Sequence, residues 1–244
     1  MKLLLIRHGD PDYAGDTLTE KGWREARLLC GRLLKLDIRA LYVSPLGRAR
    51  DTLKPYLEAT GRKAAVMPWM QEFPMHKPDE YTGRSHIIWD YLPAYRERFP
   101  DWDSAEGWMD AYPFGQWNVR PLVEEMWQGL DDILARHGYR REGRFYRVTA
   151  PNTDTIALVC HFGAATILLS HLLNISSMQL LHATFMAPTA VTTVLTEEQE
   201  RGIAQWRTIG IGDTSHLYEA GEPLSMSGFF NEAVMPGAAS PAQS

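Results

Sequence analysis

Short apolar runs that alternate with amphipathic segments constrain this sequence more than any other feature. Residues 2–6 and 155–160 carry mostly aliphatic side chains, a pattern typical of strands buried on both faces of a sheet. Further strands are expected at residues 40–43, 64–70, 189–195 and 203–210. Because amphipathic segments separate several of these runs, the sequence predicts an α/β fold.

Helix signals lie between the predicted strands. Thr19 is a good N-cap for a helix whose leucines recur at helical spacing as far as Leu36. Ser44 and Pro45 are expected to be the N-cap and first-turn residue of the next helix. Two more helices are expected at residues 121–137 and 163–173. The predicted fold is a three-layer α/β sandwich, in which helices flank a mostly parallel central sheet.

The length of 244 residues suits one large domain, which we expect to span residues 1–235. Within it, residues 75–118 are rich in aromatic side chains and interrupted by Pro and Gly, which indicates an inserted cap. The aromatic residues at 89–117 either form the wall of a specificity pocket or make the cap's own small core. Residues 236–244 are expected to be a disordered tail.

Composition excludes several classes of function. The 25 basic and 30 acidic residues give a net charge of −5, so no general attraction to nucleic acid is expected. No apolar stretch reaches membrane-spanning length, and the N-terminus lacks a signal-peptide pattern. Cys30 and Cys160 are the only cysteines, which favours reduced thiols and a cytoplasmic protein. The sequence leaves the oligomeric state open, a dimer being one option.

Two predicted strands end in a histidine close to a glycine. His8 follows residues 2–6 and His161 follows residues 155–160, so both are expected at the carboxyl edge of the sheet, where α/β proteins bind ligands. Arg7 precedes the first histidine, and Arg48 lies in the first turn of a helix that follows another strand. Guanidinium groups and a helix N-terminus both favour a bound phosphate.

These residue types suit phosphoryl transfer. The two arginines can neutralise the phosphoryl oxygens while a neutral imidazole attacks phosphorus. The second histidine can stabilise a non-bridging oxygen in the transition state. A carboxylic acid must then protonate the leaving oxygen and activate water against the phosphohistidine. The remaining histidines show no paired spacing of metal ligands, so we expect neither metal nor cofactor.

Four motifs together resemble the histidine phosphatase superfamily, in the branch named after cofactor-dependent phosphoglycerate mutase. They are LIRHG, LTEKGWREA, YVSPLGRARDT and LVCHFG, and the resemblance covers roughly residues 1–75 and 153–216. It implies a mixed sheet flanked by helices. It also implies His8 as the phosphorylated nucleophile, Arg7, Arg48 and His161 as the rest of the phosphate pocket, and Glu72 as the proton donor.

The sequence departs from the family pattern in ways that bear on function. Glu72 lacks the glycine- and tryptophan-bearing turn that usually follows the family's acid, so Asp10 and Glu80 remain alternative acids. The mutases' phosphate-contacting Asn is absent after the first RHG, which weakens a mutase reading. Phe162 excludes the branch with an Asp directly after the second histidine. The leading prediction is a metal-independent phosphomonoester hydrolase for a small phosphorylated metabolite; a phosphoglycerate-type mutase and a non-catalytic phosphate- or phosphopeptide-binding module are the alternatives.

The tripeptide alone carries little information, because Arg136-His137-Gly138 repeats it. This second copy closes the predicted helix at residues 121–137, where cations favour the helix C-terminus and glycine ends the helix. We therefore expect a structural role for it. The corresponding structural alternative for Arg48 is a surface ion pair with Asp51.

Overall fold

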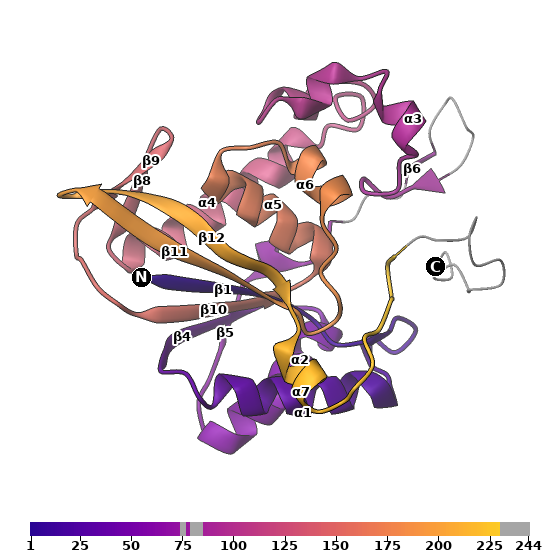
Figure 1. Cartoon of the computed structure of the whole chain (residues 1–244). Helices are drawn as coiled ribbons and strands as arrows, with labels where there is room; N and C mark the ends of the chain where they lie inside the picture. The colour runs from indigo at the N-terminus through magenta and orange to yellow at the C-terminus, as the bar shows by residue number, and fades with distance from the viewer. Residues whose placement is uncertain (74–76, 79–84, 230–244) are drawn as a thin grey trace.

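The computed structural model describes residues 1–73, 77–78 and 85–229. Its central sheet has the strand order β5-β4-β10-β1-β11-β12-β9-β8 (Figure 1). These strands are β5 (Ala65–Val66), β4 (Ile38–Val43), β10 (Thr155–Cys160), β1 (Lys2–Arg7), β11 (Val191–Glu200), β12 (Ile203–Asp213), β9 (Phe145–Val148) and β8 (Tyr139–Glu142).

Strand direction divides this sheet into two parts. The strands from β5 to β1 are parallel, and they alternate with helices along the chain. The strands from β11 to β8 pair antiparallel, so β12 and β8 run the same way as β1 while β11 and β9 oppose it. The predicted mostly parallel α/β sheet is thereby confirmed. Two small hairpins lie outside it: β2 (Pro11–Asp12) with β3 (Thr17–Leu18), and β6 (Lys77–Pro78) with β7 (Ser85–His86).

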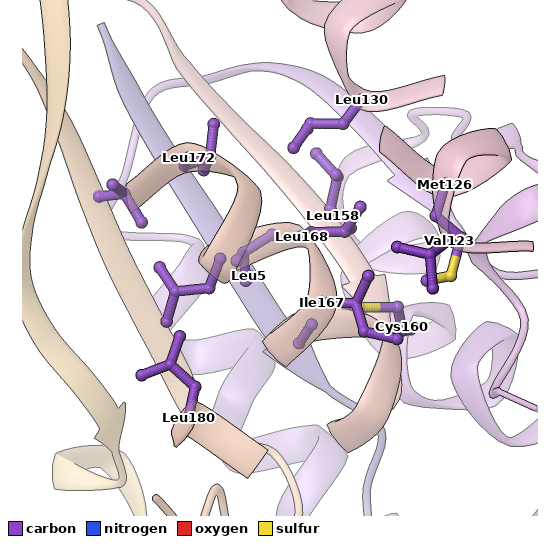
Figure 2. Packing of buried hydrophobic residues seen from close by; sticks show 14 of the residues in the cluster. Leu5, Val123, Met126, Leu130, Leu158, Cys160, Ile167, Leu168, Leu172 and Leu180 are labelled. Carbon is purple, nitrogen blue, oxygen red and sulfur yellow. The ribbon is translucent and has the colours of Figure 1, made fainter. Parts of the chain in front are cut away.

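Helices cover both faces of the sheet (Figure 1). On one face lie α1 (Glu20–Leu33), α2 (Gly47–Thr60) and α7 (Ser215–Glu219); on the other lie α4 (Arg120–Arg136), α5 (Phe162–Leu173) and α6 (Ser177–Ala183). The helix α5 is buried almost all round, because it packs between the sheet and the neighbouring helices. Figure 2 shows its Ile167, Leu168 and Leu172 packed among side chains of the strands and of α4.

Local sequence signals account for several element boundaries. The Thr19 hydroxyl accepts a hydrogen bond from the Gly22 amide, as an N-cap does, and α1 begins at the next residue. Helix α4 ends at Arg136, and Gly138 follows with a φ of +89°. The strand expected over residues 64–70 is shorter than predicted: β5 holds two residues, because Pro68 opens a 3₁₀ turn (Pro68–Met70).

The segment between this 3₁₀ turn and α4 contains few regular elements. Besides the hairpin of β6 and β7, those described are α3 (Pro93–Arg96) and two 3₁₀ helices, Pro100–Asp103 and Gly107–Met109. Its aromatic rings pack mainly on each other: the Trp102 ring lies 4.9 Å from both Phe99 and Phe114. Trp108 and Phe114 are fully buried. Many aromatic residues of the predicted cap are thus buried, in a core that is continuous with the one around α4 and α5. The predicted tail at 236–244 lies outside the described residues.

Candidate active site

The ends of β1 and β10 place two histidines side by side. Arg7 pairs with Cys160 in the parallel register, and the His8 amide donates to the Cys160 carbonyl oxygen (2.9 Å). His8 and His161 therefore leave the sheet at the same edge, and their ring centroids are 5.0 Å apart. Both are almost wholly buried, with 2% and 0% of their surface exposed.

The imidazole of His8 is held in one tautomer. Its Nδ1 lies 2.7 Å from the Gly9 carbonyl oxygen, which can only accept, so Nδ1 carries the proton. The lone pair is then on Nε2. Burial, followed by the charges of Arg7 and Arg48, lowers the pKa of His8 well below its usual value. At neutral pH the ring is therefore uncharged.

Two guanidinium groups lie near this ring, that of Arg7 buried and that of Arg48 partly buried. Arg7 is 4% exposed and donates from Nη1 to the Met186 carbonyl oxygen (2.7 Å) and from Nη2 to that of Ser227 (2.9 Å). Arg48 donates from Nη1 to Asp16 Oδ1 (2.8 Å). The Nε atoms of both arginines are buried without a hydrogen-bond partner. Each guanidinium group thus keeps an unused donor.

Asp16, rather than Asp51, is the ion-pair partner of Arg48. Asp51 instead accepts a hydrogen bond from the Thr17 hydroxyl (2.5 Å), so the alternative predicted for Arg48 is wrong in its partner. The second carboxylate oxygen of Asp16 accepts from the Gly47 amide (2.6 Å) at the start of α2. A Cβ on Gly47 would lie 2.0 Å from the Asp16 carbonyl oxygen, so only glycine allows this approach.

Ser44 belongs to the site and is not the N-cap of α2. Its hydroxyl oxygen lies 2.7 Å from His161 Nε2, and α2 begins at Gly47 after Leu46. The other ring nitrogen of His161, Nδ1, is buried without a partner. Burial and then the neighbouring His8, Arg48 and Arg7 lower the pKa of His161 well below its usual value.

Glu72 lies against the first turn of α5, directly after His161. Its carboxylate accepts from the amides of Phe73 (2.9 Å), Ala164 (3.1 Å) and Gly163 (3.3 Å). Burial raises the pKa of Glu72, although these amides and the charge of Arg7 oppose the rise. A Cβ on Gly163 would come within 2.7 Å of Glu72 Oε1, so the carboxylate fits closely here. A carboxyl with a raised pKa suits proton donation.

The alternative acid Asp10 is occupied elsewhere. Its carboxylate accepts from the hydroxyls of Thr19 (2.7 Å) and Ser225, and its amide donates to buried Glu25 (2.8 Å). Glu80 lies outside the described residues. Of the described candidates, Glu72 is the one whose carboxyl borders both Arg7 and the turn that carries His161.

A family model described as the histidine phosphatase superfamily (branch 1) matches residues 3–209. The chain belongs to this superfamily. Two curated relatives match parts of this chain. A probable phosphatase of Schizosaccharomyces pombe is 45% identical over 67 residues, covering 24% of this chain and 32% of that protein. A putative phosphoserine phosphatase of Hydrogenobacter thermophilus is 28% identical over 110 residues, covering 41% and 52%. The chain thus spans about a third and about half the length of these two relatives.

Solved structures share the fold over nearly the whole chain. A phosphoserine phosphatase from Entamoeba histolytica, in complex with 3-phosphoglyceric acid, has a TM-score of 0.61 at 20% identity and covers 88% of this chain and 98% of its own. A mycobacterial glucosyl-3-phosphoglycerate phosphatase in complex with VO3 has a TM-score of 0.57 at 21% identity, with coverage of 87% and 99%. At these identities the likeness shows the histidine phosphatase fold.

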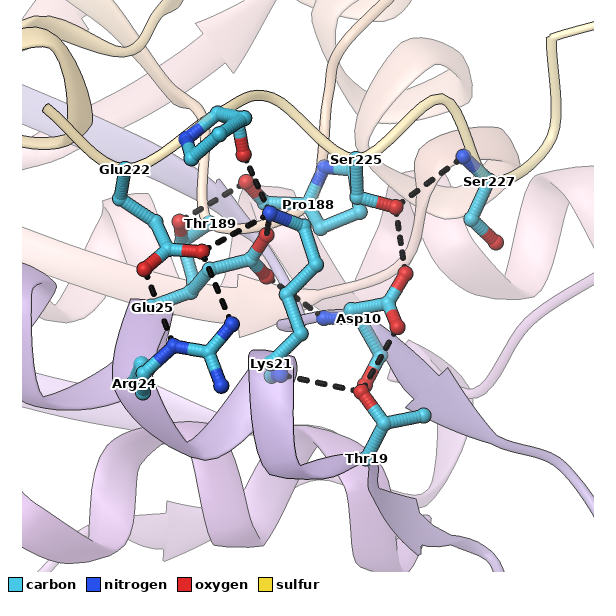
Figure 3. Close-up of polar contacts among 12 residues, drawn as sticks. Asp10, Thr19, Lys21, Arg24, Glu25, Pro188, Thr189, Glu222, Ser225 and Ser227 are labelled. Atoms are coloured by element: carbon cyan, nitrogen blue, oxygen red, sulfur yellow. Dashed lines mark hydrogen bonds and ion pairs between the residues drawn. The ribbon is translucent and has the colours of Figure 1, made fainter.

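In this member of the superfamily, residues 222–229 also reach the site, which the sequence did not suggest. We call them the C-terminal segment. The Ser227 carbonyl accepts from Arg7, and Gly228 lies against the same guanidinium group. Figure 3 shows how Glu222 and Ser225 attach the segment: Glu222 pairs with Lys21 and Arg24, and Ser225 bonds to Asp10. These residues lie far from any motif, so no local pattern could have indicated their role.

Other histidines among the described residues make structural contacts. His171 bonds to Asp131 (2.9 Å) and stacks on Trp127, while His216 lies 3.1 Å from the Thr189 hydroxyl. Within residues 1–73 and 85–229, no three His, Cys, Asp or Glu side chains are grouped so that they could hold a metal ion.

Among the helices that the structure describes, none is long and apolar enough to cross a membrane.

Proposed function

We propose that this chain is a phosphomonoester hydrolase that acts on small phosphorylated metabolites through a phosphohistidine at His8. One observation carries the proposal: Arg7 Nε, Arg48 Nε and His161 Nδ1 are buried polar atoms without partners among the described residues. They belong to the neighbours of His8, since the ring of His161 lies 5.0 Å from that of His8 and the charges of both arginines lower the pKa of His8. Buried donors are rarely left unpaired in a native structure, so their presence indicates a missing acceptor. A phosphate group supplies several acceptor oxygens and the negative charge that two guanidinium groups favour.

In the first step, His8 Nε2 attacks phosphorus in line with the ester oxygen. The P–N bond forms, the P–O bond breaks, and the electron pair passes to the leaving oxygen, which takes a proton from Glu72. Arg7 and Arg48 bind the non-bridging oxygens. Phosphoryl transfer is largely a matter of positioning and charge stabilisation, so this small set of groups is sufficient.

Ser44 determines which ring nitrogen of His161 carries the proton and can therefore donate to the phosphate. Its hydroxyl oxygen already accepts a hydrogen bond from the Leu46 amide (3.3 Å), which leaves its O–H free to donate to His161 Nε2. The ring proton then lies on Nδ1, the atom without a partner. A dianionic phosphate also favours protonation of this ring, and the added charge stabilises the transition state.

In the second step the same acid acts as a base. Glu72, now a carboxylate, takes a proton from water while the water oxygen attacks phosphorus and the P–N bond breaks. Phosphate leaves, His8 regains its lone pair, and Glu72 is protonated again. The pKa of Glu72 is raised by burial, which supports its return to the protonated form before the next turnover.

The experiment is a panel of phosphate monoesters assayed for released phosphate, in the presence and absence of EDTA. We expect turnover of some esters, unchanged by the chelator, and a phosphoenzyme with the acid lability of phosphohistidine when the reaction is quenched. Loss of activity that Mg²⁺ or Zn²⁺ restores would contradict the mechanism. A mutase would instead need a phosphorylated primer and interconvert phosphoglycerates, and a binding module would retain ligand without turnover.

A further inference from the structure

A cavity of about 350 Å³ adjoins the phosphate-binding residues. It reaches the site at Phe162, which follows His161 in the chain, and at Gly228, which lies against Arg7. The ring of Phe185, another wall residue, lies 5.9 Å below the Arg7 guanidinium carbon. A phosphate bound by Arg7 and His161 would therefore direct its ester group into this cavity.

Aromatic rings from separate parts of the chain form the walls. Trp89, from the cap, meets Phe162 of α5 edge to face with ring centroids 5.5 Å apart. Phe229, from the C-terminal segment, meets Phe185 in the same way at 5.1 Å. These two aromatic pairs are contributed by four segments distant in sequence, and all four rings line the same space. Such walls favour flat, apolar groups.

Charge in the cavity nearly cancels. Among its described lining residues, Asp90 and Arg96 carry one charge of each sign. His182 is the second basic residue of the lining, and burial lowers its pKa to about 4, so it is neutral at physiological pH. The described walls hold no surplus cation for a substrate carboxylate and no surplus anion for an ammonium group.

We infer that the preferred substrates are phosphate monoesters of uncharged, apolar alcohols, aromatic ones foremost, rather than small charged esters such as phosphoserine or 3-phosphoglycerate. The inference rests on the proposed function, because the cavity receives the leaving group of that reaction. It distinguishes this chain from the neighbouring phosphatases named for such charged esters.

The experiment compares 2-phenylethyl phosphate with O-phosphoserine and glycerol 3-phosphate. All three release a primary alkoxide, so differences in kcat/KM reflect recognition of the leaving group more than its reactivity. Burying a phenyl ring predicts a kcat/KM about 10- to 100-fold higher for the phenylethyl ester. Equal or higher kcat/KM for O-phosphoserine or glycerol 3-phosphate would overturn the inference and leave the proposed function intact. Turnover of no ester would overturn both.

A variant locates the effect in the cavity. Phe229 is 45% exposed, so Phe229→Ala should fold normally. We expect it to lower kcat/KM for 2-phenylethyl phosphate about tenfold, mainly through KM, with little change for glycerol 3-phosphate; Phe229→Leu should recover part of the loss. Tyr218, which is 88% exposed on α7 and outside the cavity, provides the control Tyr218→Ala. An equal loss for both esters in Phe229→Ala would contradict the assignment.

Discussion

The chain contains the tripeptide Arg-His-Gly twice, and the two copies have different structural roles. Residues 7–9 end strand β1 in the middle of the sheet, whereas residues 136–138 end helix α4. In the second copy, His137 is the C-cap, its Nε2 lies 3.0 Å from the Tyr42 hydroxyl, and Gly138 has the positive φ that follows many helices. The second copy therefore ends a helix and makes a structural hydrogen bond.

The difference lies in what each position brings together. A strand end in a parallel sheet lies beside the ends of its neighbours, so His8 lies beside His161, which follows β10, and His161 bonds to Ser44, which follows β4. A helix end is completed by its own last turn, and His137 donates its amide to carbonyl oxygens there. The chemistry therefore follows from the strand-end position, and the tripeptide by itself does not specify it.

The largest expected effect contrasts the two histidines directly. His8→Ala removes the proposed nucleophile and should lower kcat at least about 1000-fold, because the covalent route is lost. His137→Ala removes one hydrogen bond, to Tyr42, and should leave kcat/KM within about twofold while costing about 1 kcal/mol of stability. Steady-state kinetics and thermal melts of both variants provide the measurement. Comparable activity losses in the two variants would contradict the assignment of His8.

The next effect concerns the proton donor beside the first tripeptide. Glu72→Gln keeps an oxygen that can accept from Ala164 but cannot transfer a proton. We expect kcat on alkyl phosphates to fall about 10²- to 10⁴-fold. An activated aryl phosphate should still phosphorylate His8 and give a burst of phenol, followed by accumulated phosphoenzyme. Rapid quench resolves the two steps, with Asp10→Asn and Glu80→Gln as parallel variants. If Glu72→Gln hydrolyses alkyl phosphates at the wild-type rate, the acid is another residue.

The elements that carry the first tripeptide and its neighbouring histidine could be predicted from local sequence signals. Continuous apolar runs indicated β1 and β10, and the Thr19 cap and leucine spacing indicated α1. Parallel register then brings the strand-end histidines together without further information. Such features are predictable because burial pattern, capping and strand direction act over a few residues each.

Features that depend on distant contacts were not predictable. Ser44 has the sequence of an N-cap, yet its hydroxyl serves His161, which is 117 residues away. The polar hairpin of β8 and β9 has no apolar run, and it was missed. The C-terminal segment reaches Arg7 through backbone carbonyls, which any residue type supplies. Local propensity cannot report such tertiary pairings.

A smaller effect tests how the second strand-end histidine is oriented. Ser44→Ala should lower kcat about three- to tenfold with little change in KM, because one hydrogen bond that fixes the His161 tautomer is lost. Ser44→Thr should restore most of the rate. The pH profile of kcat should also shift, since His161 loses a partner that selects its protonated nitrogen. A loss confined to thermal stability, with kcat and its pH profile unchanged, would assign Ser44 a structural role only.

The smallest effect concerns Glu25, a buried carboxyl that contacts the residue directly after the first tripeptide. Glu25 is 0% exposed, accepts the amide of Asp10 just after Gly9, and has a pKa raised by burial to about 7. The fold disfavours the ionised form of Glu25, so ionisation lowers the free energy of unfolding. This loss is absent below the ordinary glutamate pKa and reaches its full size above pH 7. Glu25→Gln should therefore raise the Tm by about 2–4 °C at pH 8 and leave it unchanged at pH 4.

Glu219→Gln, at an exposed position on α7, is the control and should change the Tm at neither pH. A Tm of Glu25→Gln below that of the wild type at pH 8 would show that the Glu25 carboxylate stabilises the fold, contrary to the burial argument.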